Sequence, residues 1–220
     1  MPRSIAISAD KNPNNAKVET EQKVPAEQTK LNLNILEFRI VPNIGNENRE
    51  PKIPNDVFAG LRGDLMKFGP CGKLTQDSNY EWLEINTKSF RAAESLPTGI
   101  YGNNKYLLLC KKQPYTMQPY LNGLKLWGLL EVDESIDSQN RPSISFELDN
   151  IGSGLFYGLT KSNIGNRLAI VIRDKVVSAP LIQSAITGKG EIQGQFTIEE
   201  IIEMVTSLEK GLSEKKFWEW

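Results

Sequence analysis

The stretch from residue 143 to residue 211 carries the clearest secondary-structure signal in this chain. Apolar and polar residues alternate over 143–149, which predicts a strand with one buried face. Asn150 is a good N-cap type and would begin a short helix. Residues 168–172 are continuously apolar, which predicts a strand covered on both faces, and a tight reversal is expected directly after it at 173–175. These elements together indicate a packed helix-and-sheet fold.

A second helix is predicted at the end of this stretch. Thr197 and Glu200 have the spacing of a capping box, in which each side chain accepts from the other residue's backbone N–H. Gly211 stands where a left-handed cap would end the helix. Apolar residues recur between them at helical spacing, and we expect them to form the buried face: Ile198, Ile201, Ile202, Val205 and Leu208.

Short motifs follow one another in a fixed order through this region. They are Gly154, Phe156, Thr160, Asn163, Gly165, the run 168–172, Ser178-Ala179-Pro180, Ile186, Gly188, Ile192, Gly194, Phe196 and Gly211-Leu212. In this order and spacing, the chain resembles the first extracytoplasmic (periplasmic) domain of SecD and of the fused SecDF, accessory subunits of the bacterial protein-export machinery. The resemblance is firm over 120–212 and looser over 31–117. Lys175 and Ser213 depart from the family pattern, which has Gly and Pro there.

The resemblance implies a non-enzymatic domain that contacts a translocating, unfolded polypeptide. Its partners would be proteins: the preprotein, Sec components or a larger assembly. We expect an apolar groove between helices and a sheet edge. Its candidate residues are Phe156, Tyr157, Leu159, Ile192 and Phe196, for which core packing is the competing and favoured interpretation.

The composition argues against several classes of function. The chain has no histidine, so the commonest general base and metal ligand is missing, and we expect no catalytic residue, no metal site and no cofactor. Its 26 basic and 27 acidic residues nearly cancel, so no strong field attracts nucleic acid. Cys71 and Cys110 would form one disulfide in an exported protein, or act as small apolar residues in a reducing compartment.

Other features suggest chemistry but have a simpler structural interpretation. The acidic segment 133–137 is read as a solvated turn rather than as a metal or acid–base site. The glycines of 152–154 and 188–190 lack the spacing of a phosphate-binding loop, so close backbone approach or a bulge is favoured. Four aromatic residues are expected to fill the core rather than stack on a ligand: Tyr80, Trp82, Tyr106 and Trp127.

The fold class predicted for the whole chain is α+β, with two small mixed-sheet subdomains and helices packed on one face. Residues 1–30 are polar and predict a disordered tail or linker. A strand at 31–41, a helix capped by Asn55 or Asp56, and strands at 80–85 and 106–111 place the N-terminal subdomain at 31–118. The SecD-like subdomain would occupy 119–212, after a hinge at Pro114 to Pro119. A short helix at 121–128 and a strand at 129–132 would open it.

Two expectations concern the context of the chain. No window approaches the roughly 20 apolar residues of a membrane helix, whereas membrane helices flank the SecD domain. The chain is therefore either an excised extracytoplasmic domain or a stand-alone relative, cytoplasmic if complete as given, with a scaffold or interaction role in a larger assembly. An aromatic tail at 213–220 would fold back onto its own sheet or dock on another chain, through Phe217, Trp218 and Trp220.

Overall fold

The structure is a computed structural model that describes residues 36–45, 48–86, 90, 95–121 and 124–213. The chain divides into two units, Met1–Leu31 and Asn32–Trp220. The first unit, and with it the predicted disordered tail, lies outside the described residues, as does most of the aromatic tail.

The largest element is a seven-stranded mixed sheet with the strand order β5-β6-β4-β13-β12-β1-β7. Strands β13 and β4 run parallel, and the other neighbouring pairs run antiparallel. Together with four helices, this sheet confirms the α+β class. The strands of the sheet are β1 (Leu36–Ile40), β4 (Tyr80–Ile85), β5 (Thr98–Tyr101), β6 (Asn104–Cys110), β7 (Thr116–Met117), β12 (Leu168–Ile172) and β13 (Lys175–Ser178).

This sheet takes strands from both sides of the expected boundary at 118/119. Strand β1 lies between β12 and β7, and Phe38 pairs with Ile170 on one side and Met117 on the other. The division into subdomains 31–118 and 119–212 stays a prediction. Its two ranges nevertheless share one hydrogen-bonded sheet.

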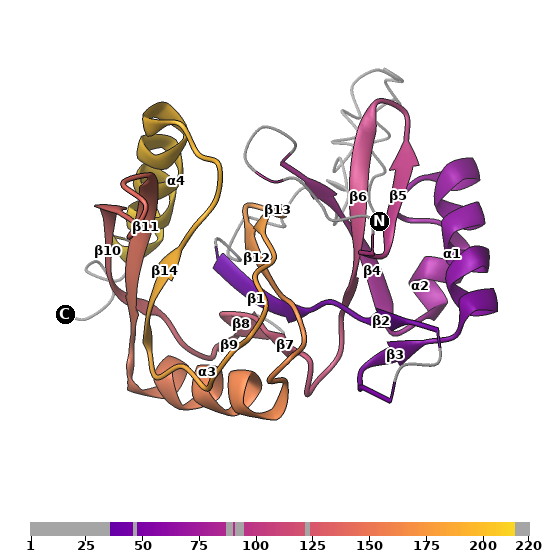
Figure 1. The fold of residues 1–220 in the computed structure, drawn as a ribbon, viewed down its shortest axis with the longest axis horizontal. Coiled ribbons are helices and arrows are strands. Elements are labelled where there is room, and N and C mark those ends of the chain that lie inside the picture. Colours follow the sequence, from indigo (N-terminus) through magenta and orange to yellow (C-terminus); the bar gives the residue numbers. More distant parts are fainter. Residues whose placement is uncertain (1–35, 46–47, 87–89, 91–94, 122–123, 214–220) are drawn as a thin grey trace, which may run out of the picture. The chain divides into compact units, whose positions relative to one another are not determined.

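A second, three-stranded sheet lies against the C-terminal helix. It has the order β10-β11-β14, and α4 contacts both β10 and β11, as Figure 1 shows. The elements of this part are β10 (Leu129–Ile136), β11 (Pro142–Leu148), α3 (Asn150–Ser162), β14 (Lys189–Ile192) and α4 (Ile198–Ser213). The remaining elements are α1 (Asn55–Phe68), α2 (Lys73–Asp77) and two small two-stranded sheets, β2 (Asn43–Ile44) with β3 (Lys52–Ile53), and β8 (Tyr120–Leu121) with β9 (Leu124–Lys125).

The strongest local signals are confirmed. All five residues of β12 are buried, as the continuous apolar run predicted. Arg173 and Asp174 adopt φ values of 49° and 60°, the left-handed geometry of a tight hairpin turn between β12 and β13. The capping box forms as well, because Thr197 N–H donates to Glu200 Oε2 at 3.0 Å and Glu200 N–H donates to Thr197 Oγ1 at 3.2 Å.

Several local predictions are wrong. The segment 121–128 contains β9 and the end of β8 rather than a helix, and Asp149, not Asn150, is the N-cap of α3. Helix α1 begins after Pro54 without a side-chain cap, and α4 continues past Gly211 to Ser213.

The buried face of α4 is also narrower than predicted. Ile198 and Ile202 are 61% and 45% exposed, whereas Ile201 is 2% exposed. The apolar spacing fitted a wide stripe, but the three-stranded sheet covers only part of it. The buried face consists of Ile201, Met204, Val205 and Leu208.

The main core cluster joins β1, the three-stranded sheet, α3 and α4. Phe38 lies at its centre, with ring centroids 4.5 Å from Phe156, 5.7 Å from Phe146 and 6.0 Å from Trp127. The prediction that Trp82, Tyr106 and Trp127 fill the core is confirmed, while Tyr80 is only half-buried.

Candidate functional site

A cavity of about 520 Å³ lies between α3 and the segment 113–118, which includes β7. Most of its lining is apolar or uncharged, and Glu50 is the one ionisable carboxylate in it. Helix α3 lines it with Gly154, Leu155, Gly158, Leu159 and Ser162, the facing wall is residues 113–118 with Leu126, and Glu50 and Asn163 complete it.

The sequence of α3 explains why space remains beside it. Gly154, Gly158 and Ser162 recur every four residues and therefore lie on one face of the helix. A Cβ atom at Gly154 or at Gly158 would meet no other atom within 4 Å. Glycine inside a helix costs about 1 kcal/mol relative to alanine. On the face toward the cavity, α3 therefore has residues that favour a helix less than alanine would.

Other residues hold α3 in place. Its N-terminus is capped by Asp149, whose Oδ1 accepts from the Gly152 N–H at 2.7 Å. On the face away from the cavity, Phe156 is 2% exposed and packs in the main core cluster. The cap and the buried face fix the helix, so the small residues at 154 and 158 are not needed for packing.

The opposite wall offers few free backbone acceptors. Strand β7 pairs with β1 along one edge. The Thr116 carbonyl accepts from Gln113 Nε2 at 2.9 Å, and the Gln118 carbonyl accepts from Trp127 Nε1 at 2.8 Å. Because these carbonyls already have donors, a molecule in the cavity would contact mainly side chains, not add a strand to this edge.

The exposed side of α3 is apolar beside the cavity. Ile151 is 63% exposed, Leu155 is 46% exposed and Tyr157 is 39% exposed. Lys161 Nζ lies 5.3 Å from the centre of the Tyr157 ring, a cation–π distance. The helix thus presents an apolar rim with one cation at its C-terminal end.

The candidate residues taken from the resemblance do not form one exposed groove. Phe156, Leu159, Ile192 and Phe196 are all buried in the main core cluster, and of these Leu159 also lines the cavity. Tyr157 is exposed on α3, whereas Phe217, Trp218 and Trp220 lie outside the described residues. A binding role for these residues stays a prediction. The small residues of α3 and the segment 113–118 were missed, although the four-residue spacing of Gly154 and Gly158 was visible in the sequence.

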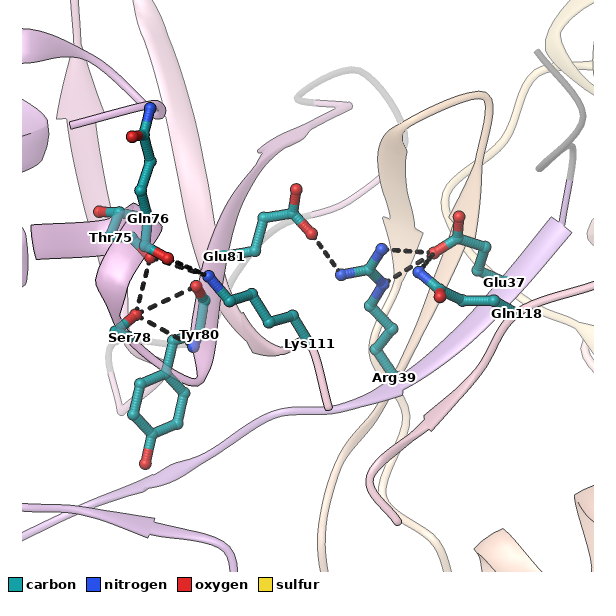
Figure 2. Close-up of polar contacts among 9 residues, drawn as sticks. All are labelled: Glu37, Arg39, Thr75, Gln76, Ser78, Tyr80, Glu81, Lys111 and Gln118. Carbon is teal, nitrogen blue, oxygen red and sulfur yellow. Dashed lines mark hydrogen bonds and ion pairs between the residues drawn. The ribbon is translucent and has the colours of Figure 1, made fainter. Parts of the chain in front are cut away.

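A buried ionic network is built on Glu37 and Arg39 of β1 and was not predicted from the sequence. Figure 2 shows the Arg39 guanidinium between two carboxylates, with nitrogen atoms 2.7 Å from Glu37 and 2.5 Å from Glu81. Gln118 Nε2 donates to the same Glu37 oxygen at 3.4 Å. The side chains of Arg39 and Glu37 are 5% and 2% exposed. Apolar and polar residues alternate in 36–40, a pattern typical of a half-exposed strand, but β1 is buried on both faces.

Burial and these carboxylates shift the pKa of Arg39 in opposite directions. Burial by itself lowers the pKa of the guanidinium, but the charges of Glu37 and Glu81 outweigh it and the pKa is raised. Arg39 therefore stays charged, and the network joins β1, β4 and the segment after β7. A second group of bonds in Figure 2 anchors Lys111, whose Nζ donates to the Thr75 and Gln76 carbonyls.

The cysteines form no disulfide. Cys71 is free and exposed, and Cys110 is free and buried at the end of β6. Burial raises the pKa of the Cys110 thiol to about 12, so it remains protonated at neutral pH and is a poor nucleophile.

The other polar candidates have structural roles. The prediction of a solvated turn at 133–137 is wrong, because Asp133 and Glu134 belong to strand β10. Asp137 does form a turn, but its side chain is buried, with Arg141 2.6 Å from its carboxylate. A Cβ at Gly188 would overlap Ser153 Oγ at 2.1 Å, and one at Gly190 would lie 2.6 Å from the Phe146 ring, which confirms close backbone approach at these two glycines. At Gly154 the prediction is wrong, because a Cβ there would meet no atom within 4 Å. Among residues with described placement, no group of three or more acidic or cysteine side chains has the arrangement of a metal site. No helix within the same residues is long and apolar enough to cross a membrane.

The segment that contains both walls of the cavity matches a known family. Residues 109–212 fit the family described as SecDF, P1 head subdomain. This part of the chain is therefore similar to the head subdomain of SecDF. The resemblance to the extracytoplasmic domain of SecD and SecDF, proteins of protein translocation, is confirmed.

Curated relatives named protein translocase subunit SecD also match part of this chain. The protein from Rickettsia typhi is 43% identical over 84 residues, covering 38% of this chain and 16% of the relative. The protein from Aquifex aeolicus is 42% identical over 76 residues, covering 34% of this chain and 15% of the relative. The matches thus span less than a fifth of each relative.

Two solved structures of SecDF are also similar. The crystal structure of its super-membrane-facing form is 25% identical, with a TM-score of 0.40, and covers 80% of this chain and 18% of that one. A structure of SecDF described as a membrane component that enhances protein export is 23% identical, with a TM-score of 0.40. It covers 90% of this chain and 70% of that one.

Proposed function

We propose that this chain is a non-enzymatic polypeptide-binding domain of a SecD-type protein-export factor, and that the cavity beside α3 receives apolar side chains of an unfolded polypeptide. One observation carries the proposal. Residues 109–212 match the SecDF P1 head subdomain, and α3 and the segment 113–118, which form the two main walls of the cavity, lie within that range. The partners we propose are therefore an unfolded preprotein and components of the Sec machinery.

The character of the cavity supports a sequence-tolerant site. Its walls combine small residues, apolar residues and amides, and the exposed Leu155 extends the apolar surface outward. Apolar contacts are non-directional, so many different side chains would fit. Because the nearby carbonyls of Thr116 and Gln118 already have donors, little main-chain pairing would add affinity. We expect dissociation constants in the micromolar range or weaker, which suits a domain that must release its client.

The non-enzymatic part of the proposal rests on chemistry. The chain has no histidine, and the raised pKa of Cys110 keeps that thiol protonated. Ser153, the serine between two glycines, donates its hydroxyl to the Leu148 carbonyl at 3.3 Å and has no histidine to activate it. Neither of these two groups is therefore an activated nucleophile.

A pair of substitutions at Gly158 tests the proposed site. Gly158→Ala adds one methyl group, whereas Gly158→Leu adds a side chain that would occupy the cavity from the open face of α3. Both changes favour the helix by about 0.5–1 kcal/mol. We expect both proteins to be at least as stable as the parent, and only the leucine variant to lose binding of an unfolded, apolar-rich peptide by about tenfold or more.

The measurement is a titration of 15N-labelled protein with a permanently unfolded peptide. Shifts in the parent and Ala variant should map to α3 and to 113–118. Equal binding by the Leu variant would show that the cavity is not the site. If none of the three proteins bound the peptide, the polypeptide-binding proposal would fail and a scaffold role would become the better explanation.

A further inference from the structure

Two arginines line a second, smaller cavity of about 200 Å³, which shares no lining residue with the cavity beside α3. Arg49 comes from the loop between β2 and β3, and Arg167 comes directly before β12. The other lining residues carry no charge: Val41, Pro42, Asn43, Ile44, Ser95, Leu96, Pro97, Gly165 and Leu181.

Backbone contacts hold both arginines in place. Arg49 Nη1 donates to the Gly165 carbonyl at 2.6 Å, and its own carbonyl accepts from Asn43 Nδ2 at 3.2 Å. Gly165 has φ +85°, and a Cβ there would lie 3.4 Å from the Arg49 Cζ, so the guanidinium lies close against the glycine backbone. Arg167 Nη1 donates to the Ala179 carbonyl at 3.0 Å, and its carbonyl accepts from Val41 N–H at 3.0 Å.

Among the residues whose placement is described, these contacts leave most of the donors free and give neither charge a counter-ion, and Arg49 is exposed to solvent. A guanidinium has five N–H donors, and each of these two uses one nitrogen on a carbonyl. Among the described residues, neither arginine forms an ion pair, although Arg167 is partly buried. Two like charges beside one cavity repel each other, and an anion between them would remove that repulsion.

We propose that Arg49 and Arg167 form an oxyanion-binding site, which accepts a carboxylate or a phosphate group through the fork geometry of the two guanidinium groups. The cavity has room for such a group with some water, because one water occupies about 30 Å³. The site uses none of the residues of the cavity beside α3. The test of anion binding can therefore succeed or fail independently of the test of polypeptide binding.

The test is a titration of the full 15N-labelled chain with inorganic phosphate, and separately with acetate, at constant ionic strength. We expect saturable shifts at the Gly165 amide and at the Nε–H signals of the two arginines. Arg49→Gln and Arg167→Gln should each weaken phosphate binding by about tenfold or more, because each removes charge-assisted hydrogen bonds. Lys52→Gln removes one charge from the neighbouring strand β3, outside the cavity lining, and should change the affinity less than about twofold.

Two further arms complete the design. Arg167 also donates a hydrogen bond to the Ala179 carbonyl, so a second variant is needed at this position. Arg167→Lys keeps the positive charge but loses the planar fork of the guanidinium. The melting temperature of the variants is measured without anion. A peptide with a free C-terminus, compared with its amidated form, identifies a polypeptide carboxylate as the source, while binding of phosphate alone identifies a phosphate group. Linear, non-saturating shifts would overturn the proposal. The proposal would also be overturned if Arg49→Gln bound phosphate as tightly as the parent, or if Lys52→Gln weakened phosphate binding as much as the arginine variants do.

Discussion

Arg39 lies in an environment that its local sequence does not predict. Its neighbours in β1 alternate as in a half-exposed strand, but its guanidinium lies in the interior between Glu37 and Glu81. Burying a charge is costly unless it is paired and hydrogen-bonded, and here the pairing partners come from β1 and β4. Glu81 is 41% exposed, so one end of the network reaches solvent.

Arg39→Met should be strongly destabilising. It would leave the Glu37 carboxylate, now 2% exposed, without its counter-ion, at a cost of about 3–5 kcal/mol in the free energy of unfolding. The double variant Glu37→Met with Arg39→Met removes both buried charges and should recover most of this loss. Urea unfolding of the parent, single and double variants measures both effects. A double variant as unstable as the single one would contradict this account.

Asp137 gives a prediction of pH dependence. Its carboxylate accepts from the Arg141 side chain at 2.8 Å and from the backbone N–H groups of Gln139 and Arg141 at 2.8 and 2.9 Å. These bonds, that to the Arg141 side chain first, lower the pKa of Asp137 below its usual 3.8. The carboxylate therefore stabilises the folded state at pH values above 3.8, and this contribution is lost as the pH falls through the lower pKa of the folded protein.

Asp137→Asn should accordingly be less stable than the parent at pH 7, and the difference should shrink below about pH 4. Unfolding free energies from urea titrations between pH 2.5 and 7 would measure it. The matched control is Asp133→Asn, since Asp133 forms no ion pair among the described residues. A difference at Asp137 that does not change with pH would rule out the charge as its cause.

At the scale of elements, α4 shows how a correct helix can be assigned the wrong face. Its capping box and apolar spacing predicted where the helix begins, but Ile201 and Ile202 were placed on the same buried face. Only Ile201 packs against the core, at 2% exposure compared with 45% for Ile202. The contacts of α4 with β10 and β11 decide which part of the apolar stripe is covered.

The neighbouring isoleucines provide a matched test of this face. Ile201→Asp places a carboxylate in the core and should cost about 3 kcal/mol or more, whereas Ile202→Asp should cost less than about 1 kcal/mol. Thermal and urea unfolding of the two variants would separate them. Similar losses at both positions would show that Ile202 also needs burial and that the face is wider than described.

At the scale of the whole molecule, β1 connects distant parts of the sequence. It pairs with β12 and β7, while its apolar residues Leu36, Phe38 and Ile40 pack in the main core cluster with residues from α3, α4 and the three-stranded sheet. The matched family range begins at residue 109 and therefore does not include β1. The core of the matched segment is completed by a strand from outside that range.

A fragment of residues 109–212 alone should therefore fail to form a fixed tertiary structure. Without β1, strand β12 loses one of its two neighbours and the core loses three large side chains, each worth about 1.5–3 kcal/mol on burial. A longer fragment, residues 32–213, should melt cooperatively. NMR dispersion and thermal melting of both fragments provide the measurement. A well-dispersed spectrum and a cooperative melt for the shorter fragment would show that the head folds independently of β1.

The sequence by itself determined the features that depend on nearby residues. The capping box of Thr197 and Glu200, the strand β11, the buried run of β12 and the reversal at 173–175 all follow from periodicity, caps and turn chemistry within a few positions. The ordered motifs that indicated the resemblance to SecD could also be recognised from the sequence, because they lie close together in the chain.

Only the tertiary structure decided what lies next to what. The placement of β1 between β12 and β7, the burial of Arg39 and the open face of α3 beside 113–118 depend on distant partners, such as Ile172, which pairs with Leu36. Periodicity shows that a residue is apolar or polar at a given spacing, but burial depends on which other element covers it. Long-range pairing, which no local pattern encodes, therefore determined the buried ionic network and both candidate sites.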